Sequence, residues 1–110
     1  MAIPSRVPDP VASVFPYETV AASQTAQVLG GAGSIGDYIS HLVIAPAAAD
    51  CGVVTLLDGG TSIPIFVGGA TVNLPTLAPF SVFVGARSVN GPWKVTTGAN
   101  VSVMAVGDFT

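Results

Sequence analysis

Charged side chains are scarce in this chain. They make up 8% of its 110 residues, against about 25% in an average soluble domain. The three cations, Arg6, Arg87 and Lys94, are scattered along the sequence, so nothing forms the basic patch that nucleic-acid binding requires. So few charges cannot coat a lone soluble domain in the usual way. We therefore expect a surface of uncharged polar residues, much of it covered by other copies of the chain or by a partner.

Long apolar runs are missing as well, although 50% of the residues are hydrophobic. No run reaches the ~18 apolar residues that a membrane-spanning helix needs. The first residues, MAIPSRVPDP, lack the continuous apolar core of a secretory signal. We therefore expect no role at a membrane and a chain that stays in the cytoplasm where it is made.

Cysteine and histidine occur once each, as Cys51 and His41. A single cysteine cannot form an intramolecular disulfide, so Cys51 is either a quiet buried thiol or a bridge between subunits. A catalytic thiol would need His41 as its base, and a metal site would need further His or Cys ligands. The pattern therefore predicts no cofactor and no metal.

Acidic residues are also few: Asp9, Glu18, Asp37, Asp50, Asp58 and Asp108. Asp37, Asp50 and Asp58 fall at predicted turns, where a solvated carboxylate that accepts backbone hydrogen bonds is the usual arrangement. Acid–base catalysis needs two groups in different environments beside one pocket, and no such pair is visible. We expect no enzymatic activity.

The periodicity of an amphipathic helix is absent throughout. Instead, about eight short runs rich in β-branched and aromatic residues are separated by Gly, Pro and Asn, a pattern typical of a sandwich or barrel. The long connection at residues 68–79 favours a jelly roll over a simple meander. We predict an all-β chain with an antiparallel, jelly-roll-like β-sandwich over residues 17–110 and an extended arm over residues 1–16.

Residues 91–109 are the most regular stretch of the chain. Two alternating runs, 93–97 and 101–105, flank a turn at residues 98–100, and this pattern predicts a β-hairpin. Trp93 opens the first run. We interpret it as an anchor in the core or between subunits, and the alternative is a stacking platform for a sugar.

Residues 38–45 read as a strand with two apolar faces. Alternation places Tyr38, Leu42 and Ile44 on one face, and Ile39, Val43 and Ala45 on the other. Such a strand is covered on both sides, and in a small sandwich a neighbouring subunit can supply the second cover. We expect His41 in this strand to be a packed or rim histidine.

A glycine-rich segment precedes that strand. Gly31, Gly33 and Gly36 match the spacing G-x-G-x-x-G of dinucleotide-binding folds. That motif carries meaning only where a helix follows it, because the pyrophosphate sits on the helix N-terminus. A β-rich run follows here, so we interpret the segment as a turn.

Residues 1–16 contain four prolines, which exclude a helix or a central strand. Between the prolines lie the apolar residues Ile3, Val7, Val11, Val14 and Phe15. A solvated tail is the alternative, but such tails seldom carry apolar residues at this density. We expect these five residues to contact another chain, since sixteen residues in the polyproline form reach roughly 50 Å, enough to reach a neighbouring subunit or another partner.

Residues 34–110 resemble small β-sandwich virion proteins of tailed bacteriophages and prophages. The phrases that carry the resemblance are SIGDYISHLVIAP, LAPFSVFVGARS and WKVTTGANVSVMAVGDF. The resemblance implies head decoration (cement) or fibre-type components whose jelly-roll subunits often form trimers. It implies no catalytic residues, and the arm lies outside it.

These observations favour a capsid decoration protein. The resemblance implies a homotrimer that contacts the major capsid protein or another virion protein, is assembled in the host cytoplasm and is located in the virion. The alternative is a carbohydrate- or receptor-binding module of a fibre or tail, which should expose aromatic side chains.

Overall fold

A computed structural model describes residues 15–68 and 78–110, and within these ranges every regular element is a strand. The strands are β1 (Tyr17–Val20), β2 (Gln27–Val28), β3 (Tyr38–Pro46), β4 (Val54–Asp58), β5 (Thr61–Phe66), β6 (Phe80–Arg87), β7 (Trp93–Thr97) and β8 (Val101–Asp108). The described residues include no helix long and apolar enough to cross a membrane. Four of the predicted arm residues, Ile3, Val7, Val11 and Val14, lie outside the described ranges.

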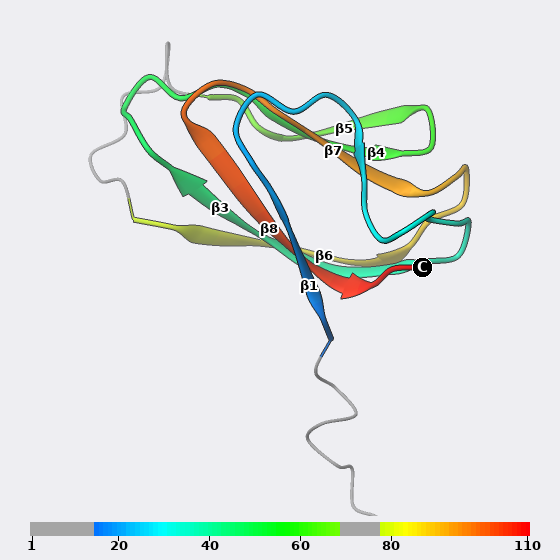
Figure 1. Ribbon diagram of the computed structural model, residues 1–110. Helices are drawn as coiled ribbons and strands as arrows, with labels where there is room; N and C mark the ends of the chain where they lie inside the picture. The colour runs from blue at the N-terminus through cyan, green and yellow to red at the C-terminus, as the bar shows by residue number, and fades with distance from the viewer. Residues whose placement is uncertain (1–14, 69–77) are drawn as a thin grey trace, which may run out of the picture.

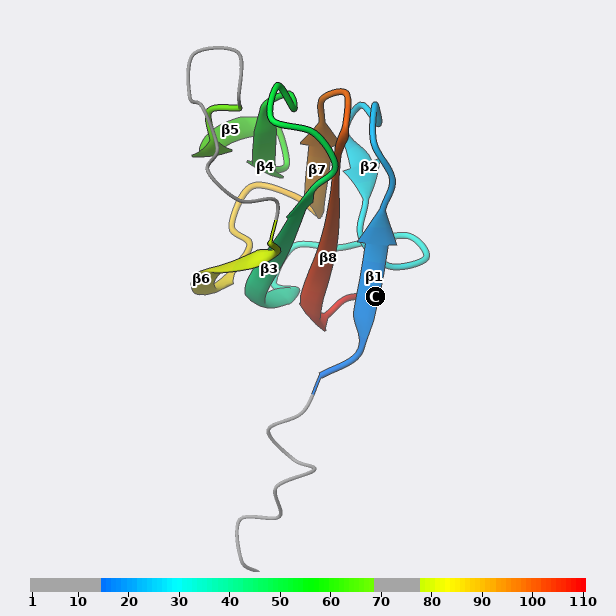
Figure 2. The same ribbon diagram turned by 90° about the vertical axis from the view of Figure 1, so that its left-hand side faces the viewer.

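The strands form two antiparallel sheets packed as two layers (Figure 1). The first sheet has the order β1-β8-β3-β6, and the second has the order β2-β7-β4-β5. Figure 2 shows the strands of each sheet next to one another in this order. Every connection except that between β4 and β5 joins one sheet to the other. This strand order is that of a jelly roll, so the prediction of an all-β sandwich with about eight strands is confirmed.

The core lies between the two sheets. Alternate residues of the central strands point inward, because successive side chains of a strand lie on opposite faces. The buried apolar side chains are Val20, Leu29, Ile39, Leu42, Ile44, Cys51, Val54, Leu56, Trp93, Val95, Val101, Val103 and Ala105. Both sheets contribute to this set, so burying it holds the two layers together.

The predicted hairpin between residues 93–97 and 101–105 is wrong. Both runs are strands, but β7 pairs with β2 and β4, whereas β8 pairs with β1 and β3. The turn between them therefore crosses from one sheet to the other. An alternating sequence shows only that a strand has one buried face. Two paired strands and two strands in opposite sheets give the same pattern, so alternation does not predict which strands pair.

Backbone contacts fix this crossing turn. The Gly98 N–H donates to the Val53 carbonyl at 2.8 Å, and the Gly52 N–H donates to the Ala99 carbonyl at 2.7 Å. The two backbones approach so closely that a Cβ atom on Gly98 would lie 2.6 Å from the Gly52 Cα atom. A side chain at position 98 would therefore force the β3–β4 and β7–β8 connections apart.

A β-bulge in β3 changes which face of the sheet its first side chains lie on. Ile39 pairs with Gly107, but His41 pairs with the adjacent Val106, so Ser40 is an extra residue relative to β8. The predicted grouping of Tyr38 with Leu42 and Ile44 is therefore wrong. Ile39 lies in the core with those two residues, and Tyr38 is half-buried on the outer face.

Other turns also depend on particular residues. The β4–β5 hairpin turns at Gly59-Gly60, and Pro64 lies in the edge strand β5 beside a bulge, a position that proline tolerates. Neither Asn90 nor Gly91, in the β6–β7 connection, has a positive φ. Gly91 instead lies against Gly59, where an added Cβ would be 2.8 Å from the Gly59 Cα atom. The glycine-rich segment leads into β3 rather than a helix, as expected.

We predict that Gly98→Ala destabilises the fold by about 1–3 kcal/mol, the usual cost of overpacking, because the new methyl group meets backbone that cannot move aside. Gly60→Ala is the matched control, since nothing lies within 4 Å of an added Cβ in that turn. Urea denaturation followed by circular dichroism measures both. Equal midpoints for the two variants would contradict the close approach at Gly98.

Candidate functional site

The outer faces of the two sheets differ in chemistry. On the second sheet, the register places Thr96 opposite Thr55, and Lys94 and Ser62 on either side of Leu57. This face therefore carries a larger share of polar side chains, although Val28, Leu57 and Pro64 also lie on it. The outer face of the first sheet is largely apolar, and it is the candidate functional site of the described residues.

A row of four side chains crosses the whole outer face of the first sheet. Tyr17 pairs with Val106, Val106 pairs with His41, and His41 pairs with Phe83. We call these four residues the aromatic row. Its two ends are open to solvent, with Tyr17 65% and Phe83 76% exposed.

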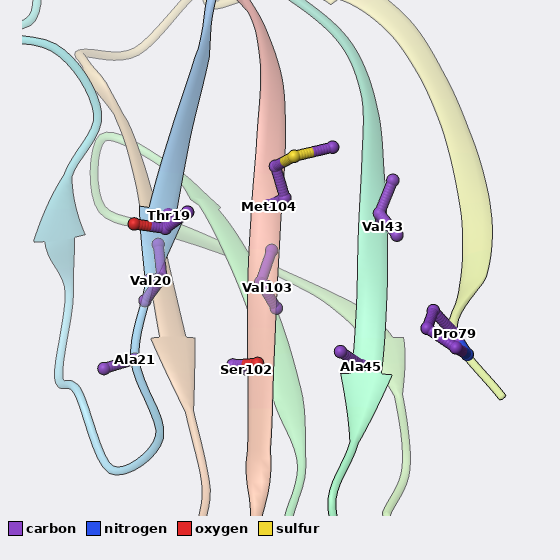
Figure 3. A pocket seen from close by; sticks show the side chains of 9 residues that line it. All are labelled: Thr19, Val20, Ala21, Val43, Ala45, Pro79, Ser102, Val103 and Met104. Carbon is purple, nitrogen blue, oxygen red and sulfur yellow. The ribbon is translucent and has the colours of Figure 1, made fainter. Parts of the chain in front are cut away.

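Next to the aromatic row, toward the β3–β4 connection, the surface is hollowed. The hollow has a volume of about 360 Å³ and lies mainly over β1, β8 and β3 (Figure 3). Its lining consists of Thr19, Val20, Ala21, Val43, Ala45, Pro79, Ser102, Val103 and Met104. Small side chains dominate this set and none is charged, so the hollow suits apolar side chains.

Charges lie only at the opposite end of this face. Asp108 and Arg87 flank Tyr38 in register, and the Arg87 guanidinium carbon lies 5.8 Å from the centroid of the Tyr38 ring. The Phe15 ring packs near the same tyrosine, with 5.2 Å between ring centroids. Phe15, which we expected to contact another chain, thus contacts Tyr38 of its own chain.

His41 is half-buried within the aromatic row, as a rim histidine would be. Its Nδ1 atom lies 3.0 Å from the Ser40 hydroxyl oxygen. The described residues contain no group of three or more His, Cys, Asp or Glu side chains that could hold a metal ion. The chemistry that this face offers is therefore apolar contact, with one imidazole at its centre.

Trp93 and Cys51 lie in the core, away from this face. Trp93 is 2% exposed, and its indole N–H donates to the Asp37 carbonyl at 2.8 Å. A ring so enclosed offers no surface to a sugar, so the stacking alternative fails at this residue. Cys51 is 1% exposed, and a bridge between subunits would require the fold to open around its thiol.

The sequence interpretation of Asp37 was wrong in one respect. Its carboxylate accepts backbone hydrogen bonds, as predicted, but it is buried rather than solvated, at 5% exposed. The N–H groups of Thr110 and Ser34 donate to Oδ2 at 3.0 and 3.1 Å, and their hydroxyls contact Oδ1 at 3.1 and 3.2 Å. Asp37 therefore ties the start of β3 to the residues that follow β8.

The pKa of Asp37 reflects two opposing effects. Burial by itself raises the pKa of the carboxyl group, but the N–H groups and hydroxyls of Thr110 and Ser34 stabilise the carboxylate and hold its pKa below the ordinary value of 3.8. This carboxylate is a structural group, because its acceptor positions are used by its own chain.

Asp58 has a similar role at the β4–β5 hairpin. It is 6% exposed rather than solvated, and its carboxylate accepts the N–H groups of Val89 and Asn90 at 3.0–3.1 Å. Asp50 is exposed, as predicted. Sequence alone does not distinguish the buried Asp37 and Asp58 from the exposed Asp50, because the donors to Asp37 and Asp58 come mainly from segments distant in the chain.

No protein-family model, curated protein or solved structure matches this chain. The resemblance to phage virion proteins therefore stays a prediction.

We predict that Asp37→Asn lowers stability at pH 7 by about 1–3 kcal/mol, because it removes the charged partner of buried donors. Since the folded pKa of Asp37 lies below its ordinary value, its contribution is complete above about pH 4 and is lost as the pH falls through the folded pKa. The stability gap between the native chain and the variant should therefore narrow in acid. Asp50→Asn is the control, and thermal melts from pH 7 to pH 2 measure all three proteins. A gap that stays constant over this range would contradict the proposed role of the charge.

Proposed function

We propose that this protein is a structural, non-enzymatic component of a tailed-phage virion, a capsid decoration protein that binds the capsid surface as a homotrimer. The observation that carries the proposal is the outer face of the first sheet. Four strands present the aromatic row and the adjoining hollow there, with charges confined to the end at Tyr38.

Exposing such an apolar face to water is energetically unfavourable. Monomeric soluble proteins seldom expose a contiguous apolar patch larger than a few hundred Å², and patches beyond that size are typical of protein–protein contacts. The outer face of the second sheet carries a larger share of polar residues, among them Lys94, Thr55 and Thr96, so the two outer faces suit different surroundings. A protein partner, either another copy or a larger assembly, accounts for this difference.

The jelly-roll fold and the resemblance in residues 34–110 favour a viral particle as the assembly that this protein joins. Jelly rolls are common in viral shells, where subunits bury broad faces against one another. A charge-poor chain whose two outer faces differ in polarity suits a subunit fixed on such a shell. The capsid as partner, the trimer and the virion as location rest on the resemblance.

A carbohydrate-binding module of a fibre or tail is the second candidate. The exposure of Tyr17 and Phe83 favours it, because jelly rolls also occur in lectins and aromatic rings stack on sugars. Two assays on the same variants separate the two candidates. If the native chain binds a glycan, loses that binding in Tyr17→Ala and Phe83→Ala, and does not bind particles, the binding module is correct.

We predict that Phe83→Asp shifts the purified protein from oligomer toward monomer, because it places a charge in the covered face. Ser62→Asp is the matched control, since it introduces the same residue at an exposed position of the edge strand of the second sheet. Light scattering at micromolar concentration measures the mass of each protein, and circular dichroism checks its fold. A native chain that is monomeric in this assay would contradict the proposed oligomer.

Particles that lack this protein test the capsid role directly. We expect the native chain to bind them to saturation and folded Phe83→Asp to bind at least tenfold more weakly, with Ser62→Asp unchanged. Sedimentation of particles with added protein measures occupancy. Absence of binding by the native chain would refute the decoration role.

A further inference from the structure

We propose that the N-terminal segment of one copy, residues 1–14, occupies the hollow on the first sheet of a neighbouring copy. The inference rests on the oligomer in the proposed function and names which part of the chain joins its subunits. Three observations carry it: the position of the hollow within the sheet, its small side chains, and the direction in which the chain enters β1.

The hollow lies on the face of a sheet rather than at an edge. β8 runs through its centre and is paired on both sides, with β1 and with β3. The backbone groups of β8 beneath the hollow are therefore used within the sheet, so an occupant over β8 is held by side-chain contacts. A proline-rich segment suits such a site, because Pro4, Pro8 and Pro10 have no N–H group to satisfy.

The dimensions of the hollow fit one extended segment. Neighbouring strands lie about 4.8 Å apart, so the span from β1 across β8 to β3 is about 10 Å, close to the width of an extended chain with its side chains. Ala21, Ala45 and Ser102 are short and leave this space open. Apolar residues such as Val7 and Val11, held between prolines, have the size and chemistry to enter it.

The direction of β1 makes a neighbour's hollow the better site. Tyr17 pairs with Val106 and Val20 pairs with Val103, so β1 runs toward the hollow and the residues before it enter from the opposite end of the face. The Pro16 carbonyl accepts the Gly107 N–H at 3.1 Å, and Phe15 packs on Tyr38. Fourteen residues reach roughly 40 Å in the polyproline form, which is enough to cross to a second copy.

Disulfide trapping between two differently substituted full-length proteins tests the proposal. One protein carries Val7→Cys, or Ile3→Cys or Val11→Cys in parallel samples, and the other carries Ala45→Cys or Ser102→Cys in the hollow. After mixing and mild oxidation, we expect a disulfide-linked heterodimer on a non-reducing gel, at least fivefold more abundant than with Ser62→Cys on the second sheet. The native chain alone controls for Cys51.

The assay has two outcomes that overturn the proposal. In the first, Ala45→Cys and Ser102→Cys give no more disulfide-linked heterodimer than Ser62→Cys does. This result would show that residues 1–14 lie elsewhere. A cross-link that forms only within a chain carrying both Val7→Cys and Ala45→Cys would show that each segment folds back onto its own hollow. The assay contains no capsid, so its result is independent of the particle-binding test.

Discussion

The packing of two inner faces against each other is the interaction on which the rest of this structure depends. Nearly every connection passes from one sheet to the other, and at each end of the sandwich a crossing connection lies close to the backbone of another connection. Gly52 meets Gly98 at one end and Gly59 meets Gly91 at the other. The buried carboxylates of Asp37 and Asp58 then hold the neighbouring loops by accepting their N–H groups.

The sequence predicted the strands well, because alternation and turn residues are local properties. It did not predict how the strands pair. Trp93 and Val101 begin runs with the same pattern, yet the runs belong to different sheets, and only contacts with distant strands decide this. The extra residue at Ser40 was equally invisible, since a bulge is defined relative to its partner strand, and the buried state of Asp37 depends on donors as distant as Thr110.

The candidate site was predicted in outline only. Two apolar faces in residues 38–45 indicated an apolar outer face, and the structure places the half-buried Val43 and Ala45 on that face. Its cover by a neighbouring subunit stays a prediction. The aromatic row could not be predicted, because the bulge in β3 and the pairing of β8 bring Tyr17, His41 and Phe83 into line. The row gives this face its exposed rings, and the register that creates it is non-local.

The strand edges of the sandwich bear on how the protein behaves at high concentration. An open edge can pair with another molecule and extend the sheet without limit. β2 has only two residues, β1 has four, and β5 is interrupted by Pro64 and a bulge. β6 is the long edge, and Gly85, with φ of 63°, bulges within it. These features disfavour fibrous aggregation through the sheet edges, so the oligomer that we propose would form through the faces, where an assembly can close at a defined size.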